Sequence, residues 1–288
     1  MYDHVHSKHN QKKTRMIKLI ITDMDGTFLN HCGDYNRPLF EETRQRMREQ
    51  NVHFALCTGK QVERVEELLG AQSDDFWILG DSATRIKHRG EIIYQSLLSN
   101  QLGLDIIRKA KSVKGSHVVI ACTPDYAAIT RDTPNHIREL VKRSYTELKL
   151  VDTYDEITSD FVKITLYDEN EQCPALRPHL SEFDQHAYIV VSEAAWIDIA
   201  NAGVHKGNTV AKLQALLNVT EAETMVFGDG LNDIELMARA QFSFAMRNAY
   251  EETKAAARYV TLSNDEDGVL QTILQFLALQ KSVGLQKA

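Results

Sequence analysis

A chain of 288 residues is long enough for two domains, and 43% hydrophobic with 25% charged residues is typical of an ordinary folded protein. The net charge of −7 argues against a nucleic-acid partner, because a phosphate backbone requires a basic surface. Four scattered cysteines and the lack of a membrane-length apolar run predict a cytoplasmic protein with free thiols and no membrane partner. The polar residues 1–15 lack the apolar segment of a signal peptide, and we predict a flexible tail there.

The first folded part of the chain alternates strands and helices. Strands are predicted at 16–22, 52–58 and 76–80, and helices at 40–50 and 61–70. The second helix is closed by a glycine, a common helix terminator. This strand–helix rhythm is typical of a parallel sheet covered by helices on both faces.

The rhythm changes in the middle of the chain. Helices are predicted at 101–113, 135–148 and about 173–183, and strands at 117–123, 126–131, 161–168, 186–193 and 196–201. Short turns between neighbouring strands favour antiparallel pairing. We therefore predict an α+β domain over residues 84–193, inserted into the α/β domain.

The first rhythm resumes after Gly203. Helices are predicted at 206–218, 232–240, 251–257 and 268–280, and strands at 224–230, 242–246 and 258–261. The predicted fold class is α/β: a Rossmann-like doubly wound parallel sheet core, formed by residues 16–83 and 194–288, with the inserted α+β domain between them.

Polar residues follow three of the predicted core strands, and a lysine precedes a core helix. These residues are Asp23 and Asp25, Thr58, Lys206, and Asp229, Asn232 and Asp233 in "GDGLND". Ligands of open α/β sheets bind beyond the carboxyl ends of the strands. If the three strands are neighbours, we expect these side chains to converge on one site.

Two aspartates one residue apart repel each other, so their pairing predicts a bound cation. Carboxylate oxygens suit Mg²⁺, which usually takes one or two protein carboxylates and completes its shell with water and phosphate. We predict Asp23 and Asp229 as direct ligands and the backbone carbonyl of Asp25 as a third, since Gly26 allows a sharp turn. A phosphate bound alongside would meet Lys206 and the Thr58 hydroxyl.

The motifs "DMDGT", "CTG", "HKG" and "GDGLND", in this order, resemble the four motifs of the haloacid dehalogenase-like (HAD) superfamily. The inserted domain resembles the type-B class II cap of the Cof-type sugar-phosphatase branch, and "MRNAYEETKAAARYVTLSNDEDGV" is similar to that branch as well. The resemblance spans nearly everything from Met16 onward. It implies Mg²⁺-dependent hydrolysis of a phosphate monoester on a small metabolite such as a sugar phosphate.

The resemblance also implies a role for each motif residue. Asp23 is implied as the nucleophile that forms an aspartyl-phosphate, and Asp25 as the general acid that then activates water. Some ATPases of the superfamily have threonine at the second position, which slows hydrolysis of the intermediate. Asp25 in this chain therefore favours turnover to free phosphate.

The remaining roles concern the phosphoryl group and the metal. The residues implied are Thr58, Gly59 and Lys206 for the phosphoryl group, Asp229 for Mg²⁺, Asn232 for phosphate or metal support, and Asp233 as a supporting residue. Thr58 is also suited to cap the following helix, and its two roles are compatible. Lysines are common in turns before helices, so the role of Lys206 depends largely on the resemblance.

Three positions depart from the usual family pattern. Lys60 replaces a common arginine, which keeps the charge but loses the planar fork, and Phe28 replaces a frequent leucine. Asp81 stands where an amide is usual, near the expected cap hinge and substrate entrance, where it could disfavour highly anionic substrates. Asp198 and Asn201, near the return from the cap, are expected to stabilise a turn, with contact to the substrate as the alternative.

Two alternative functions remain open at this stage. A phosphomutase of the phosphomannomutase type has the same cap and returns the phosphoryl group to a sugar instead of to water. A catalytically silent protein that binds a phosphorylated metabolite would keep the fold without turnover. The sequence predicts neither the substrate nor the oligomeric state.

Cys57 is expected to be a small buried core residue.

Overall fold

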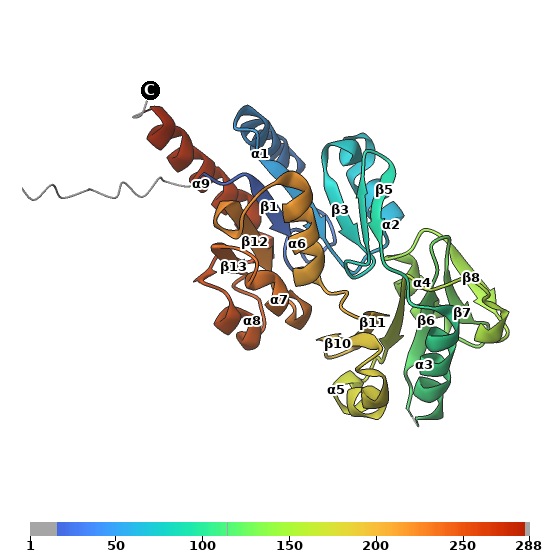
Figure 1. Ribbon diagram of the computed structural model, residues 1–288. Coiled ribbons are helices and arrows are strands. Elements are labelled where there is room, and N and C mark those ends of the chain that lie inside the picture. The colour runs from blue at the N-terminus through green and yellow to red at the C-terminus, as the bar shows by residue number, and fades with distance from the viewer. Residues whose placement is uncertain (1–15, 114, 286–288) are drawn as a thin grey trace, which may run out of the picture.

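The computed structural model describes residues 16–113 and 115–285, which form two lobes with one β-sheet each (Figure 1). The predicted tail, residues 1–15, lies outside the described residues. The helices are α1 (Arg37–Glu49), α2 (Val62–Leu69), α3 (Asn100–Ser112), α4 (Asn135–Lys142), α5 (Cys173–Leu176), α6 (Lys206–Leu217), α7 (Ile234–Met237), α8 (Glu251–Ala256) and α9 (Gly268–Leu285). The strands are β1 (Leu19–Thr22), β2 (His53–Cys57), β3 (Trp77–Gly80), β4 (Arg85–His88), β5 (Glu91–Gln95), β6 (Val118–Cys122), β7 (Ala127–Thr130), β8 (Leu148–Val151), β9 (Lys163–Tyr167), β10 (Ala187–Glu193), β11 (Trp196–Asn201), β12 (Thr224–Gly228), β13 (Phe242–Ala245) and β14 (Tyr259–Val260).

The larger sheet has the order β14-β13-β12-β1-β2-β3-β4-β5. From β14 to β3 all pairs are parallel, and the chain leaves β1 first toward β2 and later returns on its other side with β12. The Rossmann-like doubly wound core is thereby confirmed. In such sheets the point where the strand order reverses is the usual ligand site, and here that point lies between β1 and β12.

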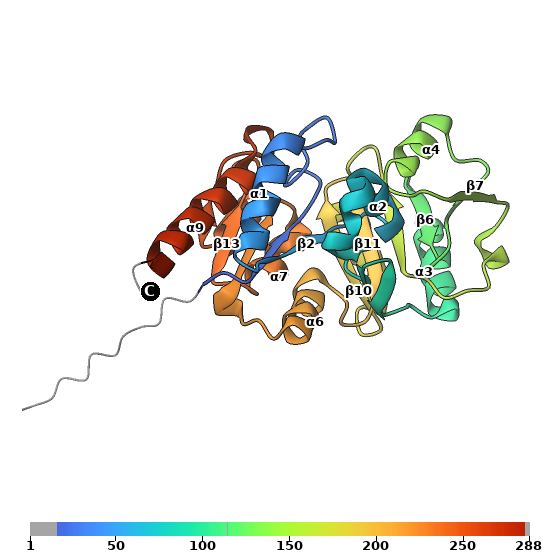
Figure 2. The same cartoon turned by 90° about the horizontal axis from the view of Figure 1, so that it is seen from above.

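The central strands of this sheet are buried on both faces, and side chains alternate between these faces along each strand. In β1, Ile20 packs in a cluster with residues of α1, α2 and α9, whereas Leu19 and Ile21 pack in a cluster with α6 and α7. Figure 2 shows α1 and α9 on one side of the sheet and α6 on the other. This two-sided cover holds the carboxyl ends of β12, β1 and β2 at one level.

The hairpin β4–β5 was not predicted from the sequence. It extends the edge of the larger sheet in antiparallel pairing. Its two turn residues, Arg89 and Gly90, both have positive φ, 51° and 76°. A two-residue turn with both residues left-handed matches the twist of a hairpin, but arginine lacks the usual sequence signature of that turn.

The smaller sheet has the order β10-β11-β9-β6-β7-β8, with β7–β8 its parallel pair. Side chains of α3 and α5 cover one face, and α4 packs on the other. The predicted antiparallel pairs β6–β7 and β10–β11 are confirmed. The predicted helix 135–148 is wrong beyond Lys142, where α4 ends. Tyr145 is buried in the core, and the Glu147 carbonyl accepts a hydrogen bond from the Ala127 N–H. The edge strand β8 begins at the next residue, Leu148.

The chain does not pass from one sheet to the other at residues 84 and 193, the boundaries predicted for the inserted domain. Strands β4 and β5 stay in the larger sheet, and β11 belongs to the smaller one. The Asn201 side chain donates a hydrogen bond of 3.0 Å to the Ser96 hydroxyl, so the two connecting segments lie side by side. We propose that the cap comprises the chain between these two residues.

Asp81 does not lie at the substrate entrance, so that prediction is wrong. Its carboxylate is fully buried and accepts a hydrogen bond of 2.7 Å from Arg85 Nε, while the Arg85 fork also binds Glu63. Burial raises the pKa of Asp81, and Arg85 opposes this effect. Asp81, Ser82 and Ala83 all have positive φ, a strained turn that only surrounding contacts can hold. Asp81 is therefore a structural residue of this turn.

Arg85→Met is expected to lower the free energy of unfolding by about 3 kcal/mol, because a fully buried Asp81 carboxylate would lose its cation. Urea unfolding at neutral pH measures the change. Arg46→Met on α1 is the matched control, since Arg46 pairs at 3.7 Å with Glu42 on the surface, where such pairs contribute under about 1 kcal/mol. Equal losses in the two variants would contradict the buried-pair interpretation.

Candidate active site

The three central strands of the larger sheet bring the predicted motif residues together. Thr22 pairs in register with both Leu56 of β2 and Phe227 of β12, so the three strands end at nearly the same level. Asp23 follows β1 directly, Thr58 follows β2, and Asp229 follows β12. Their convergence therefore results from parallel pairing of segments that are distant in the sequence.

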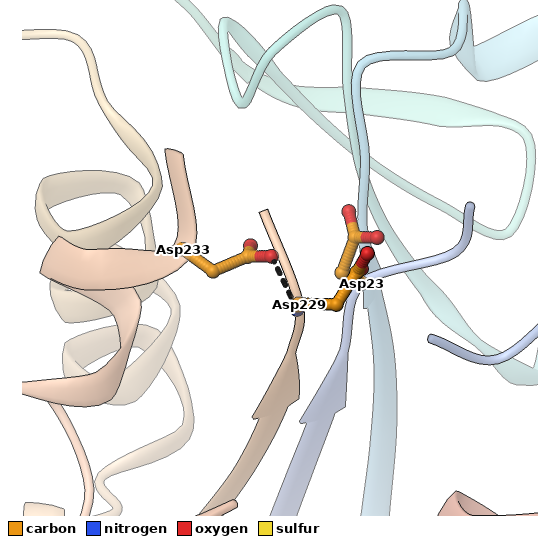
Figure 3. A group of neighbouring side chains, drawn as sticks. All are labelled: Asp23, Asp229 and Asp233. Atoms are coloured by element: carbon orange, nitrogen blue, oxygen red, sulfur yellow. Dashed lines mark hydrogen bonds between the residues drawn. The ribbon is translucent and has the colours of Figure 1, made fainter. Parts of the chain in front are cut away.

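Lys206 lies between two carboxylates at the start of α6. Its Nζ is 2.6 Å from Asp23 Oδ1 and 2.6 Å from Asp233 Oδ1, and all three side chains are almost entirely buried. The other oxygen of Asp233 accepts the backbone N–H groups of Asp229 and Gly230, each at 3.0 Å. Figure 3 shows Asp233 reaching toward the loop that carries Asp229. Asp233 thus orders both the lysine and this loop.

Asp229 is held beside the loop that follows β1. The Thr27 hydroxyl donates a 2.6 Å hydrogen bond to Asp229 Oδ1. Gly26 has a φ of 72°, and a Cβ atom there would lie 2.3 Å from Asp229 Oδ2. Only glycine therefore allows the close approach of this loop to the carboxylate.

The charges of this cluster leave a net negative site. Burial raises the pKa of Asp23 well above its ordinary value, with Lys206 opposing and Asp233 and Asp229 adding to the rise. Burial, followed by repulsion from Asp233, raises the pKa of Asp229 to about 7. Burial disfavours the Lys206 ammonium, but the Asp23 and Asp233 carboxylates outweigh it and hold the pKa of Lys206 well above its ordinary value. In the described part of the chain, the ammonium of Lys206 is thus the single cation within this cluster of three carboxylates, Asp23, Asp229 and Asp233.

The cluster fits a small divalent cation. Carboxylate oxygens of Asp23, Asp229 and Asp233 lie within 4.8 Å of one another (Figure 3). A divalent cation would offset the two charges that remain when all three carboxylates are ionised and one is paired with Lys206. Asp233 is the least suited ligand, because its oxygens already accept three hydrogen bonds.

Asp25 is turned away from this acidic cluster. Its side chain is 54% exposed and lies 2.8 Å from Lys60 Nζ, whose side chain is only 9% exposed. The lysine that departs from the usual arginine therefore holds the second aspartate at the mouth of the site. The sequence indicated only that the charge at this position is kept, and the ion pair with Asp25 is visible only in the structure.

If the chain has the phosphatase activity that the sequence resemblance implies, Lys60→Met is expected to lower the rate of phosphate release roughly tenfold, because Asp25 would lose the charge-assisted bond that orients it. Lys60→Arg, which keeps a cation at this position, serves as the matched control and should retain most of the rate. Steady-state phosphate release measures both variants. A full rate in Lys60→Met would show that Asp25 needs no such orientation.

Thr58, Gly59 and Asn232 lie around the same cavity as the aspartates. The Thr58 hydroxyl accepts a 3.1 Å bond from the Lys60 backbone N–H. It does not cap α2, because that helix begins at Val62 with Gln61 as its N-cap. Cys57, next to Thr58, is buried as predicted, and burial raises the pKa of its thiol to about 12.

The cavity above these residues has a volume of about 320 Å³ and lies between the two sheets' lobes. Its cap side was largely missed by the sequence analysis. The cap residues that line it include Arg143, Tyr145, Lys163, Thr165, Glu193, Trp196 and Asp198. No motif marks them, because they come from three separate stretches of the chain that only the folded cap brings together. The volume suits a small-molecule ligand.

The sequence indicated that Asp198 stabilises a turn, and this prediction is wrong. Asp198 lies within β11, is buried, and its Oδ1 is 3.1 Å from Lys163 Nζ and 2.8 Å from the Thr165 hydroxyl. Burial alone would raise the pKa of Asp198, but Lys163 and Thr165 outweigh it and hold the pKa below its ordinary value. Asp198 is thus an ionised partner of Lys163.

Comparison with known proteins identifies the family. A family model described as haloacid dehalogenase-like hydrolase matches residues 20–273. The chain belongs to this family. It is 31% identical over 258 residues to an Escherichia coli protein named 5-amino-6-(5-phospho-D-ribitylamino)uracil phosphatase YbjI, covering 89% of this chain and 95% of the relative. The chain is accordingly a HAD-like phosphatase, which confirms the predicted family and enzyme class.

Solved structures agree with the fold. The crystal structure of SMU.1108c from Streptococcus mutans has a TM-score of 0.87 and 28% identity, covering 91% of this chain and 99% of that chain. The HAD subclass IIB sugar phosphatase BT4131 has a TM-score of 0.76 at 21% identity, covering 90% and 98%. The second likeness concerns the fold, including its cap. In residues 16–113 and 115–285, none of the helices has the length and apolar character that crossing a membrane requires.

Proposed function

We propose that this phosphatase hydrolyses small phosphorylated metabolites through an aspartyl-phosphate on Asp23, with Mg²⁺ as its cofactor. The observation that carries the proposal is the ion pair Asp23–Lys206, in which Asp23 lines the floor of the cavity and Lys206 is buried, with Asp25 and Lys60 at the cavity mouth. Lys206 binds one oxygen of Asp23, which leaves the other for attack on phosphorus. Thr58, Gly59 and Asn232 are the proposed contacts of the phosphoryl group.

The proposed reaction has two steps. In the first, the Asp23 oxygen bonds to phosphorus, the bond to the leaving oxygen breaks, and Asp25 donates a proton to that oxygen. In the second, Asp25 takes a proton from water, whose oxygen attacks phosphorus while the bond to Asp23 breaks. Phosphate leaves, and both aspartates return to their initial states. Lys206 stabilises negative charge in both steps because it is already in place.

The proposed metal ligands are the carboxylates of Asp23 and Asp229 and the backbone carbonyl of Asp25. The cation would neutralise phosphoryl oxygens as the reacting groups approach. Asp233 supports this arrangement through Lys206 and the loop N–H groups. The acidic cluster and its uncompensated charge support the choice of a divalent cation.

The proposed substrate is a phosphorylated polyol or sugar that carries further polar groups. Aromatic rings of Tyr145 and Trp196 and the hydroxyl groups of Thr165 and Ser192 line the cap side of the cavity. Such a lining suits a hydroxyl-rich leaving group with a flat ring. The first candidate is the substrate in the name of the Escherichia coli relative, 5-amino-6-(5-phospho-D-ribitylamino)uracil. A cytoplasmic location and the lack of a nucleic-acid partner remain predictions.

The decisive experiment is phosphate release from a panel of phosphorylated metabolites, with Mg²⁺ and with EDTA. We expect release that EDTA abolishes and Mg²⁺ restores, with highest kcat/KM for the ribityl compound or a related sugar phosphate. Release that is unaffected by EDTA would contradict the metal proposal. Isomerised sugar phosphate without free phosphate would favour the phosphomutase alternative, which nothing in the site specifically supports.

A further inference from the structure

Lys163 is a buried lysine of the cap that binds the core. It lies at the start of β9, and its Nζ donates to the Gly59 carbonyl at 2.8 Å, the Ser82 hydroxyl at 3.1 Å and Asp198 Oδ1 at 3.1 Å. The residue is 3% exposed. Burial disfavours its ammonium, but Asp198 outweighs burial and holds the pKa of Lys163 above its ordinary value. The ammonium is therefore charged at neutral pH.

All three protons of Lys163 are donated to fixed acceptors, so this lysine has none left for a substrate. Two of the acceptors, Gly59 and Ser82, belong to the core loops that follow β2 and β3. Although Lys163 lines the cavity, its contacts are those of a residue that holds protein groups in place.

The Gly59 carbonyl belongs to the same peptide unit as the Lys60 N–H. That N–H donates to Thr58 Oγ1 at 3.1 Å. Within the described residues, the Thr58 hydroxyl accepts this bond and donates to no protein group, so its proton is available to the cavity. A continuous chain thus runs from the Lys163 ammonium through one peptide unit to the Thr58 hydroxyl. Bonds linked in such a chain polarise one another and strengthen the final donor.

We propose that Lys163 is a positioning residue for Thr58: through the Gly59–Lys60 peptide unit, it keeps the Thr58 hydroxyl proton directed at a phosphoryl oxygen. This inference rests on the proposed role of Thr58 in binding the phosphoryl group. It makes the phosphoryl-binding loop dependent on the cap, because the cation that orders the loop comes from the cap sheet. When the cap lies against the core, the Thr58 hydroxyl is already oriented before a substrate binds.

The test is a double-mutant cycle between Lys163→Met and Thr58→Val, with kcat, KM and inhibition by inorganic phosphate measured for each protein. Thr58→Val removes the hydroxyl and keeps the shape. We expect Lys163→Met to lower kcat about tenfold in the wild-type background and less than about twofold in Thr58→Val, since residues acting through one another are non-additive. Phosphate inhibition should weaken in both single variants and no further in the double variant.

Tyr188→Phe is the matched control for cap docking. Its hydroxyl donates a 2.8 Å bond from β10 to Glu235 of the core and not to the Gly59–Lys60 peptide unit. Any effect of this change should multiply with that of Thr58→Val. If Lys163→Met multiplies in the same way, or leaves kcat unchanged, the positioning role is overturned. A full rate in Thr58→Val alone would instead overturn the role of Thr58 in the proposed function.

Removal of Lys163 leaves Asp198 buried without its cation, which could prevent folding. The cycle is then repeated in an Asp198→Asn background, where the amide oxygen still accepts from Thr165. Thermal unfolding confirms that each protein is folded before its kinetics are compared. The same non-additivity supports the proposal there, and independent effects overturn it.

Discussion

Asp23→Asn is expected to lower phosphate release by about 10⁴-fold or more, because the amide cannot supply the attacking oxygen. Asparagine has nearly the same shape and can still accept a bond from Lys206. The protein should therefore fold, and in EDTA it should be at least as stable as the wild type, since one of three crowded carboxylates has lost its charge. Phosphate release under saturating substrate and urea unfolding measure the two effects.

Asp74→Asn is the matched control for this change. Asp74 is exposed and lies outside the motifs and the cavity lining, so the same substitution there should leave the rate within about twofold of wild type. Substantial residual release in Asp23→Asn, with the protein folded, would exclude Asp23 as the nucleophile. Such a result would favour a mechanism in which water attacks phosphorus without a covalent intermediate.

Lys206→Met is expected to lower both activity and stability. The change leaves Asp23 and Asp233 buried without the cation that they share, at a cost of about 3 kcal/mol in the free energy of unfolding at pH 7. Phosphate release should fall by roughly 10²–10³-fold, as for the loss of one preorganised electrostatic group. Urea unfolding in EDTA and steady-state release measure these losses.

The stability deficit of Lys206→Met should shrink as the pH falls from 7 to 5. Burial already raises the pKa of Asp23, and loss of Lys206 removes the group that opposes this rise. A carboxyl whose pKa is raised by folding destabilises the fold as pH rises between its unfolded and folded pKa values, so protonation at lower pH relieves the cost. A deficit that stays constant over this range would contradict buried repulsion as the cause.

Lys212→Met is the matched control for the lysine. It lies on the same helix, α6, but its side chain is exposed and its neighbour is the ring of Tyr94. Its loss should change the free energy of unfolding by about 0.5 kcal/mol or less. A similar deficit in both variants would mean that the helix, rather than the buried pair of carboxylates, responds to the loss.

The sequence by itself determined the parallel core and the positions of its motif residues. Strands such as β1 are short apolar runs, and the polar residues that end them stand out against that background. Asp23, Thr58 and Asp229 could be placed at one site because parallel strands carry their carboxyl ends to the same edge. The order of the four motifs added the family and its chemistry.

Only the tertiary structure decided which charged groups pair. Asp81 and Arg85 are close in sequence, but their burial depends on packing that no local pattern predicts. Lys60 and Asp25 meet across two loops, and Lys163 reaches Gly59 from another sheet. Such contacts depend on how the elements of the fold pack against one another. Packing sets the burial and the distance of each charged pair, and these two quantities determine the strength of a charge interaction. The cap side of the cavity could therefore not be predicted from the sequence, whereas the acidic residues at its floor could.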